Sequence, residues 1–236
     1  MAKVKNVPWK IRDIVNVIFI VMLLFILSKL MLSYLGIEKI YETTNYKSWI
    51  ILGIYIMQIL IITIPLILFT VVKYGSKIRD FGFNKVKIRK LILGVIMAYL
   101  AFIGFGILIS IFSFLTGTEI PGFQEQEEIL PLFGEDPFSL IIAFIVIVVI
   151  APIFEEIFFR GYVLQTLIKK VNVYWGSIIT ALFFSFVHFE FQIFLSIFVL
   201  AIIINWLFIR FKSIWPCVAF HTLNNLITFL VVINYS

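Results

Sequence analysis

The chain has 236 residues, of which 62% are hydrophobic, and its mean hydropathy is +1.12. Soluble domains are about 45–50% apolar, so this composition excludes an ordinary soluble domain and indicates a polytopic membrane protein. The formal net charge is +6, but the basic residues fall in short loops between apolar runs, which predicts no nucleic-acid partner. The single cysteine, Cys217, excludes an intrachain disulfide and a cysteine-based metal cluster.

Seven apolar runs are long enough for membrane-spanning helices, since one span needs about 20 apolar residues. We therefore expect an all-α transmembrane helical bundle with about seven spans, and eight as the alternative. The approximate limits of the runs are 14–35, 49–71, 91–114, 138–168, 174–190, 191–209 and 215–233. The fifth and sixth runs meet at Glu190 with almost no linker. This turn is therefore tight, or one of the two helices does not cross fully.

The basic residues predict the orientation of the bundle. Fifteen of the nineteen Lys and Arg residues lie before the first run or in alternate loops after it, so the positive-inside rule places the N-terminus in the cytosol. Residues 1–137 would then form the N-terminal membrane helices, with a basic cytosolic loop at 72–90 and an acidic outer loop at 115–137. Residues 138–236 would form the rest of the same membrane domain. The acidic loop, which we interpret as solvated, contains Glu119, Glu125, Glu127, Glu128, Glu135 and Asp136.

Three ionisable side chains interrupt the fourth run: Glu155, Glu156 and Arg160. A charge at the centre of a span costs roughly 2.5–3.5 kcal/mol, so these groups are expected to face a polar interior. Adjacent residues on a helix diverge by about 100°, and Glu156 and Arg160 are four residues apart and can form an ion pair. We interpret Glu155 as facing a cavity and the other two as structural support. The alternative is that all three only hold the bundle together.

Both histidines of the chain, His188 and His221, fall in predicted spans. Glu155 lies about as far before the turn between the fourth and fifth runs as His188 lies after it. In an antiparallel hairpin the two residues reach one depth, roughly 20–25 Å of helix from that turn. A carboxylate and an imidazole at one depth can act as an acid–base pair. Asn205, in the sixth run, is interpreted as a bridge between helices.

Three motifs follow one another on consecutive predicted helices: Glu-Glu-x-x-x-Arg at 155–160, Phe-x-x-x-His at 184–188 and His-x-x-x-Asn at 221–225. In this order they resemble the CPBP family. Its members are the CAAX-type prenyl-protein endopeptidases and the bacterial proteins, formerly called Abi, of bacteriocin-processing and immunity type. The resemblance covers about 75 residues, and no motif residue departs from the pattern.

The resemblance implies an intramembrane endopeptidase whose catalytic core is the helical region 138–236. Glu155 and His188 would activate a water, and His221 and Asn225 would stabilise the oxyanion. Glu156 and Arg160 would support the site, and Phe184 would pack beside His188. No cofactor is certain, and we prefer a metal-free mechanism. Zinc is the alternative, with Glu155, His188 and His221 as three ligands, although the chain lacks His-Glu-x-x-His.

Two further functions compete with the endopeptidase. One is a non-catalytic immunity or regulatory membrane protein of the same fold, and the other is a proton-coupled transporter that uses the buried Glu and His as a relay. The expected partners are the lipid bilayer and a peptide or protein substrate in or at the membrane. The compact size and the frequent Ile, Phe, Lys and Asn favour a prokaryotic plasma membrane, and with it a pheromone or bacteriocin precursor as the substrate rather than a prenylated CAAX protein.

Overall fold

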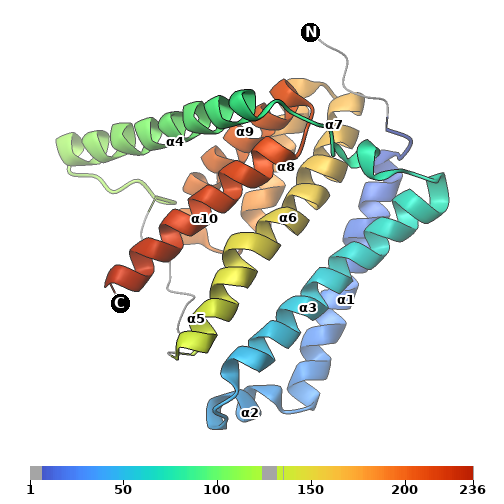
Figure 1. Cartoon of the computed structure of the whole chain (residues 1–236), viewed down its shortest axis with the longest axis vertical. Helices are drawn as coiled ribbons and strands as arrows, with labels where there is room; N and C mark the ends of the chain where they lie inside the picture. Colours follow the sequence, from blue (N-terminus) through green and yellow to red (C-terminus); the bar gives the residue numbers. More distant parts are fainter. Residues whose placement is uncertain (1–6, 124–131, 135, 236) are drawn as a thin grey trace. The chain divides into compact units, whose positions relative to one another are not determined.

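The computed structural model describes residues 7–123, 132–134 and 136–235, and this part of the chain folds into helices and turns without a strand (Figure 1). Glu125, Glu127, Glu128 and Glu135 of the predicted acidic loop lie outside the described residues. Within the described part, six helices are long and apolar enough to cross a membrane: Ile11–Tyr34, Lys47–Val72, Ile88–Thr116, Pro137–Lys170, Phe191–Phe211 and Trp215–Asn234. The predicted all-α transmembrane bundle is confirmed, and the chain is an integral multi-pass membrane protein.

The outward faces of the long helices are apolar. Phe19 and Leu30 on one helix, and Leu100 and Leu108 on another, each expose between 62% and 67% of their surface. Soluble monomers rarely expose apolar patches of this extent, whereas lipid chains solvate them well. Helices also satisfy their own backbone hydrogen bonds, which the hydrocarbon region of a bilayer requires.

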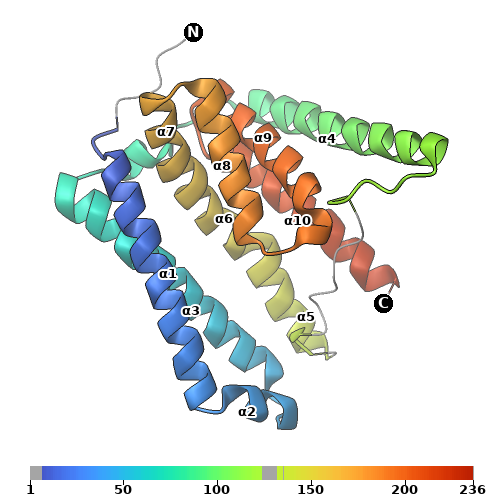
Figure 2. The same cartoon turned by 180° about the vertical axis from the view of Figure 1, so that it is seen from behind.

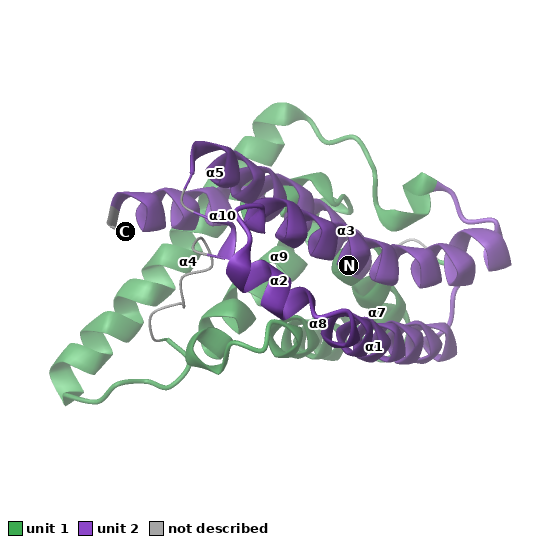
Figure 3. Ribbon diagram, turned by 90° about the horizontal axis from the view of Figure 1, so that it is seen from below, with its two compact units in different colours: residues 1–7, 78–127, 159–221 green, residues 8–77, 128–158, 222–236 purple. Residues whose placement is uncertain are grey.

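Two compact units divide the chain (Figure 3). Unit 1 contains Met1–Val7, Ile78–Glu127 and Phe159–His221, and unit 2 contains Pro8–Lys77, Glu128–Phe158 and Thr222–Ser236. The helix Pro137–Lys170 and the last helix, α10 (Trp215–Tyr235), each contribute residues to both units. The expectation that residues 138–236 form the functional core stays a prediction.

Unit 1 is built around α8 (Val173–Val187), which packs against α7 (Gln165–Lys170) and α9 (Phe194–Phe211) (Figure 2). The Oδ1 atom of Asn172 caps α8 by accepting the N–H of Trp175 at 2.9 Å. Gly176 allows the close approach of α7, because a Cβ atom at this position would lie 2.8 Å from the backbone nitrogen of Ile168. The helix α4 (Ile88–Thr116) lies against α9 in the same unit.

The fifth predicted span, 174–190, is shorter in the structure. Helix α8 has 15 residues, about 22 Å at 1.5 Å per residue, whereas the hydrocarbon core of a bilayer is about 30 Å thick. His188 is the C-cap, Phe189 has a φ of 54°, and a short 3-10 turn, Phe191–Ile193, leads into α9. Of the two alternatives for this turn, the structure therefore favours a helix that does not cross fully.

Unit 2 contains a helical hairpin and a small apolar core. Helices α1 (Ile11–Tyr34) and α3 (Lys47–Ile67) lie side by side, and α2 (Ile37–Thr43) joins them (Figure 1). Asp136 caps α5 (Pro137–Ala143) by accepting two backbone N–H groups at 3.0 and 3.1 Å. The core contains Phe133, Ile142, Ala143, Val146, Val148 and Phe229, with Ile51, Leu52 and Tyr55 of α3 packed against it.

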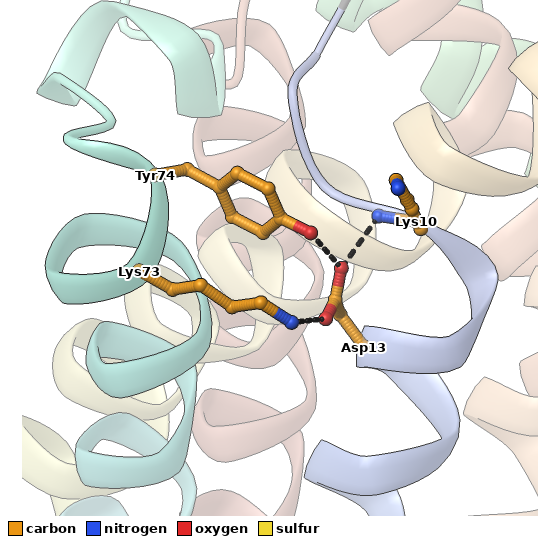
Figure 4. A network of polar contacts seen from close by, with 4 residues as sticks. All are labelled: Lys10, Asp13, Lys73 and Tyr74. Atoms are coloured by element: carbon orange, nitrogen blue, oxygen red, sulfur yellow. Dashed lines mark hydrogen bonds and ion pairs between the residues drawn. The ribbon is translucent and has the colours of Figure 1, made fainter.

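A polar cluster joins the beginning of α1 to the segment after α3 (Figure 4). Asp13 is 1% exposed and accepts three hydrogen bonds, from the backbone N–H of Lys10 at 2.8 Å, the Tyr74 hydroxyl at 2.7 Å and the Lys73 ammonium at 2.5 Å. The hydrogen bond to Asp13 raises the pKa of Lys73 above its ordinary 10.5, and it also raises the pKa of Tyr74 above 10.0. Lys73 and Tyr74 therefore keep their protons at neutral pH, and their bonds to Asp13 hold the beginning of α1 against the segment after α3.

Replacing Lys73 by methionine is expected to lower the thermal unfolding temperature at pH 7 to 8, because Asp13 loses its cationic partner. The raised pKa sets the sign of the pH dependence: the Lys73 contribution is complete below 10.5 and is lost as the pH rises through the higher folded-state value. The difference between wild type and Lys73→Met should therefore shrink in strongly alkaline buffer. Thermal unfolding of both purified proteins in detergent, at pH 7 to 8 and in strongly alkaline buffer, measures this difference in unfolding temperature. The matched control is Lys29→Met on the exposed side of α1, and equal unfolding temperatures for the two variants would contradict the prediction.

Candidate active site

The acidic pair lies in the middle of the long helix Pro137–Lys170. Glu155 and Glu156 are the last two residues of the segment α6 (Ala151–Glu156). A π-helical segment precedes α6 (η4, Phe144–Ile150), and another follows it (η5, Ile157–Leu164). Such widened turns are rare and often occur at functional sites. Glu156 is fully buried, whereas Glu155 is only partly buried. The predicted roles, in which Glu155 faces a cavity and Glu156 supports the fold, stay predictions.

Arg160 on η5 is 0% exposed and is held by α9. Its Nε atom donates to Oδ1 of Asn205 at 3.0 Å, and its Nη2 atom donates to the carbonyl oxygen of Ala201 at 3.2 Å. The guanidinium carbon lies 4.6 Å from the ring centroid of Phe184 on α8, in a cation–π arrangement. Arg160 thus ties η5 to two other helices of unit 1.

Asn205 connects the same three segments. Besides accepting from Arg160, it donates from Nδ2 to the carbonyl oxygen of Ser177 on α8 at 2.9 Å. The prediction that Asn205 bridges helices is confirmed, but its contact with Arg160 was not foreseen. The sequence shows only that Asn205 is an amide inside an apolar run. Since Asn205 lies 45 residues from Arg160 in the chain, no local spacing predicts their contact.

Phe184 contacts the guanidinium of Arg160 and both imidazoles. It is 1% exposed, and its ring centroid is 4.6 Å from that of His188 and 5.8 Å from that of His221. The expected packing of Phe184 beside His188 is present, and the contact with Arg160 adds to it. Unit 1 therefore brings four of the predicted site residues together: Arg160, Phe184, His188 and His221.

His188 makes a hydrogen bond that assigns its tautomer. Its Nδ1 atom lies 2.7 Å from the carbonyl oxygen of Phe184. A carbonyl oxygen only accepts, so Nδ1 must carry the proton, and in the neutral ring the lone pair is then on Nε2. His188 is partly exposed, whereas His221 is 5% exposed. In the neutral His188 ring, Nε2 is therefore the nitrogen that can accept a proton.

Nuclear magnetic resonance can test this assignment, since the chain contains only two histidines. In protein labelled with ¹⁵N-histidine, neutral His188 is expected to show a protonated Nδ1 and an unprotonated Nε2. The His188→Gln variant identifies its signals by their loss. A neutral His188 with the proton on Nε2 would show that the bond to the Phe184 carbonyl is not made in solution.

The other predicted site residues lie in unit 2. Asn225 donates from Nδ2 to the carbonyl oxygen of Ile147 at 3.0 Å, which joins α10 to η4. Glu155 and Glu156 also belong to this unit. Pro216 is the second residue of α10, in the first turn, where proline is favoured. The described residues within either unit contain no group of three or more His, Cys, Asp and Glu side chains that could hold a metal ion.

Comparison with known proteins gives two matches. A model of the family described as type II CAAX prenyl endopeptidase Rce1-like matches residues 137–227, a range that includes all three motifs. A Bacillus subtilis (strain 168) protein named "Putative membrane peptidase YdiL" is 28% identical over 111 residues. The resemblance to the CPBP family is confirmed.

The similarity to CPBP proteins is confined to part of each chain. The match to the Bacillus subtilis protein covers 47% of this chain and 43% of that relative, so this chain spans less than half of it. No solved structure matches the chain. The CPBP match begins with α5 and ends inside α10, so it covers the helices that carry Glu155, His188, His221 and Asn225.

Proposed function

We propose that the chain is an intramembrane endopeptidase that cleaves a membrane-associated peptide or protein with a water activated by Glu155 and His188. The observation that carries the proposal is the hydrogen bond from His188 Nδ1 to the carbonyl oxygen of Phe184, because it places the proton on Nδ1 and makes Nε2 the basic nitrogen of the neutral ring. Similarity to the CPBP family supports the proposal independently.

The position of His188 supports access to water. It caps the C-terminus of α8, which is shorter than a full span, and a non-helical turn follows. Irregular backbone at membrane depth is tolerated only where protein buries it or where it lines a water-filled cavity. In this proposal the turn after α8 admits the attacking water beside the imidazole.

The proposed reaction uses the roles that the resemblance to the CPBP family assigns to these residues. The water adds to the peptide carbonyl as its proton passes to the Glu155–His188 pair, and the carbonyl oxygen becomes an oxyanion. N–H groups of His221 and Asn225 stabilise that charge, and such donors are most effective in a site of low dielectric. The same proton then passes to the amine as the peptide bond breaks. Asn225 has two amide hydrogens. One bonds to the carbonyl oxygen of Ile147, and in this proposal the other donates to the oxyanion.

The preferred mechanism is metal-free, and zinc is the alternative. Imidazole nitrogens and a carboxylate are donors that a catalytic zinc site also uses, so chemistry alone permits both. Activity of the purified protein after dialysis against a chelator decides between them. Full retention supports the glutamate-based mechanism, whereas loss of activity that zinc restores would replace it with the metal mechanism.

The substrate class that we propose is a bacterial precursor peptide at the plasma membrane. The similarity to a Bacillus subtilis protein supports a bacterial membrane. The family model that matches is described as one of prenyl endopeptidases, so a prenylated CAAX protein is the alternative substrate. Peptides should be compared in membranes of cells with the wild-type protein and of cells with Glu155→Gln. A precursor that accumulates only with the variant, and that the purified wild type cleaves in liposomes, supports the proposal. Identical peptide sets would favour a non-catalytic immunity or regulatory protein.

A further inference from the structure

Asn205 is a buried amide on α9 whose two polar atoms are both used. Its Oδ1 atom accepts from Nε of Arg160 at 3.0 Å, and its Nδ2 atom donates to the carbonyl oxygen of Ser177 at 2.9 Å. A guanidinium only donates and a carbonyl only accepts, so the amide fits in one orientation only. The side chain is 0% exposed, and water does not compete for either bond.

Asn205 helps to set the plane of the Arg160 guanidinium. That group also donates from Nη2 to the carbonyl oxygen of Ala201, one turn before Asn205 on the same helix, at 3.2 Å. Two bonds from different nitrogens of one rigid planar group determine both its position and its tilt. The guanidinium carbon lies over the Phe184 ring, 4.6 Å from its centroid.

Phe184 links Arg160 to the imidazoles because it contacts all three side chains. Its ring lies 4.6 Å from the His188 ring and 5.8 Å from the His221 ring, and its carbonyl oxygen holds His188 Nδ1. Phe184 is 1% exposed, and side chains in such close packing cannot shift alone. A displaced guanidinium would therefore displace the Phe184 ring and, with it, both imidazoles.

We infer that Asn205 is a positioning residue of the proposed endopeptidase, which orients Arg160 and, through the contact of Arg160 with Phe184, sets the positions of His188 and His221. The inference rests on the proposed function, because it assigns Asn205 to that site. Asn205 lies outside all three motifs, so the contacts alone assign this role.

Three substitutions separate positioning from simple stability. Asn205→Leu removes both hydrogen bonds while keeping a similar volume. Asn205→Asp keeps the acceptor toward Arg160 and removes the donor to Ser177. Thr180→Val is the matched control, since it removes a buried hydroxyl bond to the Gly176 carbonyl on α8, 2.7 Å long, and leaves the bonds of Arg160 intact. If Asn205→Leu does not fold, Asn205→Ser takes its place, because the serine hydroxyl is one bond shorter and does not reach Arg160.

The first readout is the pair of imidazole signals, which requires no substrate. In detergent-solubilised protein labelled with ¹⁵N-histidine, Asn205→Leu is expected to shift the signals of both His188 and His221, because the neighbouring aromatic ring moves. Asn205→Asp and Thr180→Val should keep the wild-type signals. Unchanged imidazole signals in folded Asn205→Leu, or in Asn205→Ser, would overturn the inference whatever the activity.

The second readout is cleavage of the precursor peptide that accumulates with Glu155→Gln. Asn205→Leu should lower kcat by about 100-fold with little change in KM, since misplacement of a catalytic group by about 1 Å has an effect of this size. Asn205→Asp should recover most of that loss, and Thr180→Val should have the wild-type kcat. A wild-type kcat for Asn205→Leu would overturn the positioning role. If instead Glu155→Gln and His188→Gln cleave as fast as wild type while the imidazole signals still shift in Asn205→Leu, the proposed function fails and the structural link through Phe184 stands.

Discussion

Replacing Glu155 by glutamine, or His188 by asparagine, is expected to lower kcat by about 10²–10⁴-fold, the usual contribution of general acid–base catalysis. Glutamine matches the size of glutamate but cannot accept a proton from water. Asparagine can keep a donor near the position of Nδ1 but has no basic nitrogen in place of Nε2. Because both residues are only partly buried, neither change should unfold the protein. Rates for the purified variants in liposomes, measured beside their unfolding temperatures, test the expectation.

Glu119→Gln is the control for the glutamate substitution, since Glu119 is an exposed residue outside the motifs. It should cleave at the wild-type rate. The Glu155 variant should keep substrate binding, because its effect is on the chemical step. Wild-type cleavage by both the Glu155 and His188 variants would exclude an endopeptidase that uses these groups. A preserved cellular phenotype in the same variants would then support the non-catalytic alternative.

Replacing Arg160 by methionine is expected to have the largest effect on stability, roughly 2–4 kcal/mol. Methionine fills much of the same volume but leaves Oδ1 of Asn205 and the carbonyl oxygen of Ala201 without their donor. Bonds to a charged donor contribute about 1.5–3 kcal/mol each in soluble proteins, and interhelical bonds in membranes average about 0.6, so two bonds give a value in this range. Unfolding in detergent with added denaturant measures the difference.

Arg210→Met on α9 is the matched control for Arg160. Arg210 is exposed near the end of the helix, so its loss should change stability by no more than about 0.5 kcal/mol. The Arg160 variant should also lose the imidazole signals typical of wild type, since Phe184 loses the cation on its face. Equal stability of the Arg160 and Arg210 variants would show that the buried guanidinium is not a structural link.

The sequence was sufficient for the class of fold because hydrophobic length is a local property. A run of about 20 apolar residues has to form a helix in the bilayer, whatever its neighbours do. The same reasoning overestimated the fifth span. The predicted span continued to residue 190, but α8 ends at Val187. Phe189 has a positive φ there, a backbone conformation that composition does not reveal.

For the candidate site, too, local sequence features identified some residues, and only the tertiary structure showed their contacts. Glu155, Arg160, His188 and His221 were found from sequence, because each is a costly polar group inside an apolar run and each belongs to a motif with helical spacing. Tertiary structure alone decided that Asn205 holds Arg160, and that Phe184 touches the guanidinium and the imidazole of His221. These contacts join residues on different helices, and no spacing along one helix determines which side chains of another helix it will meet.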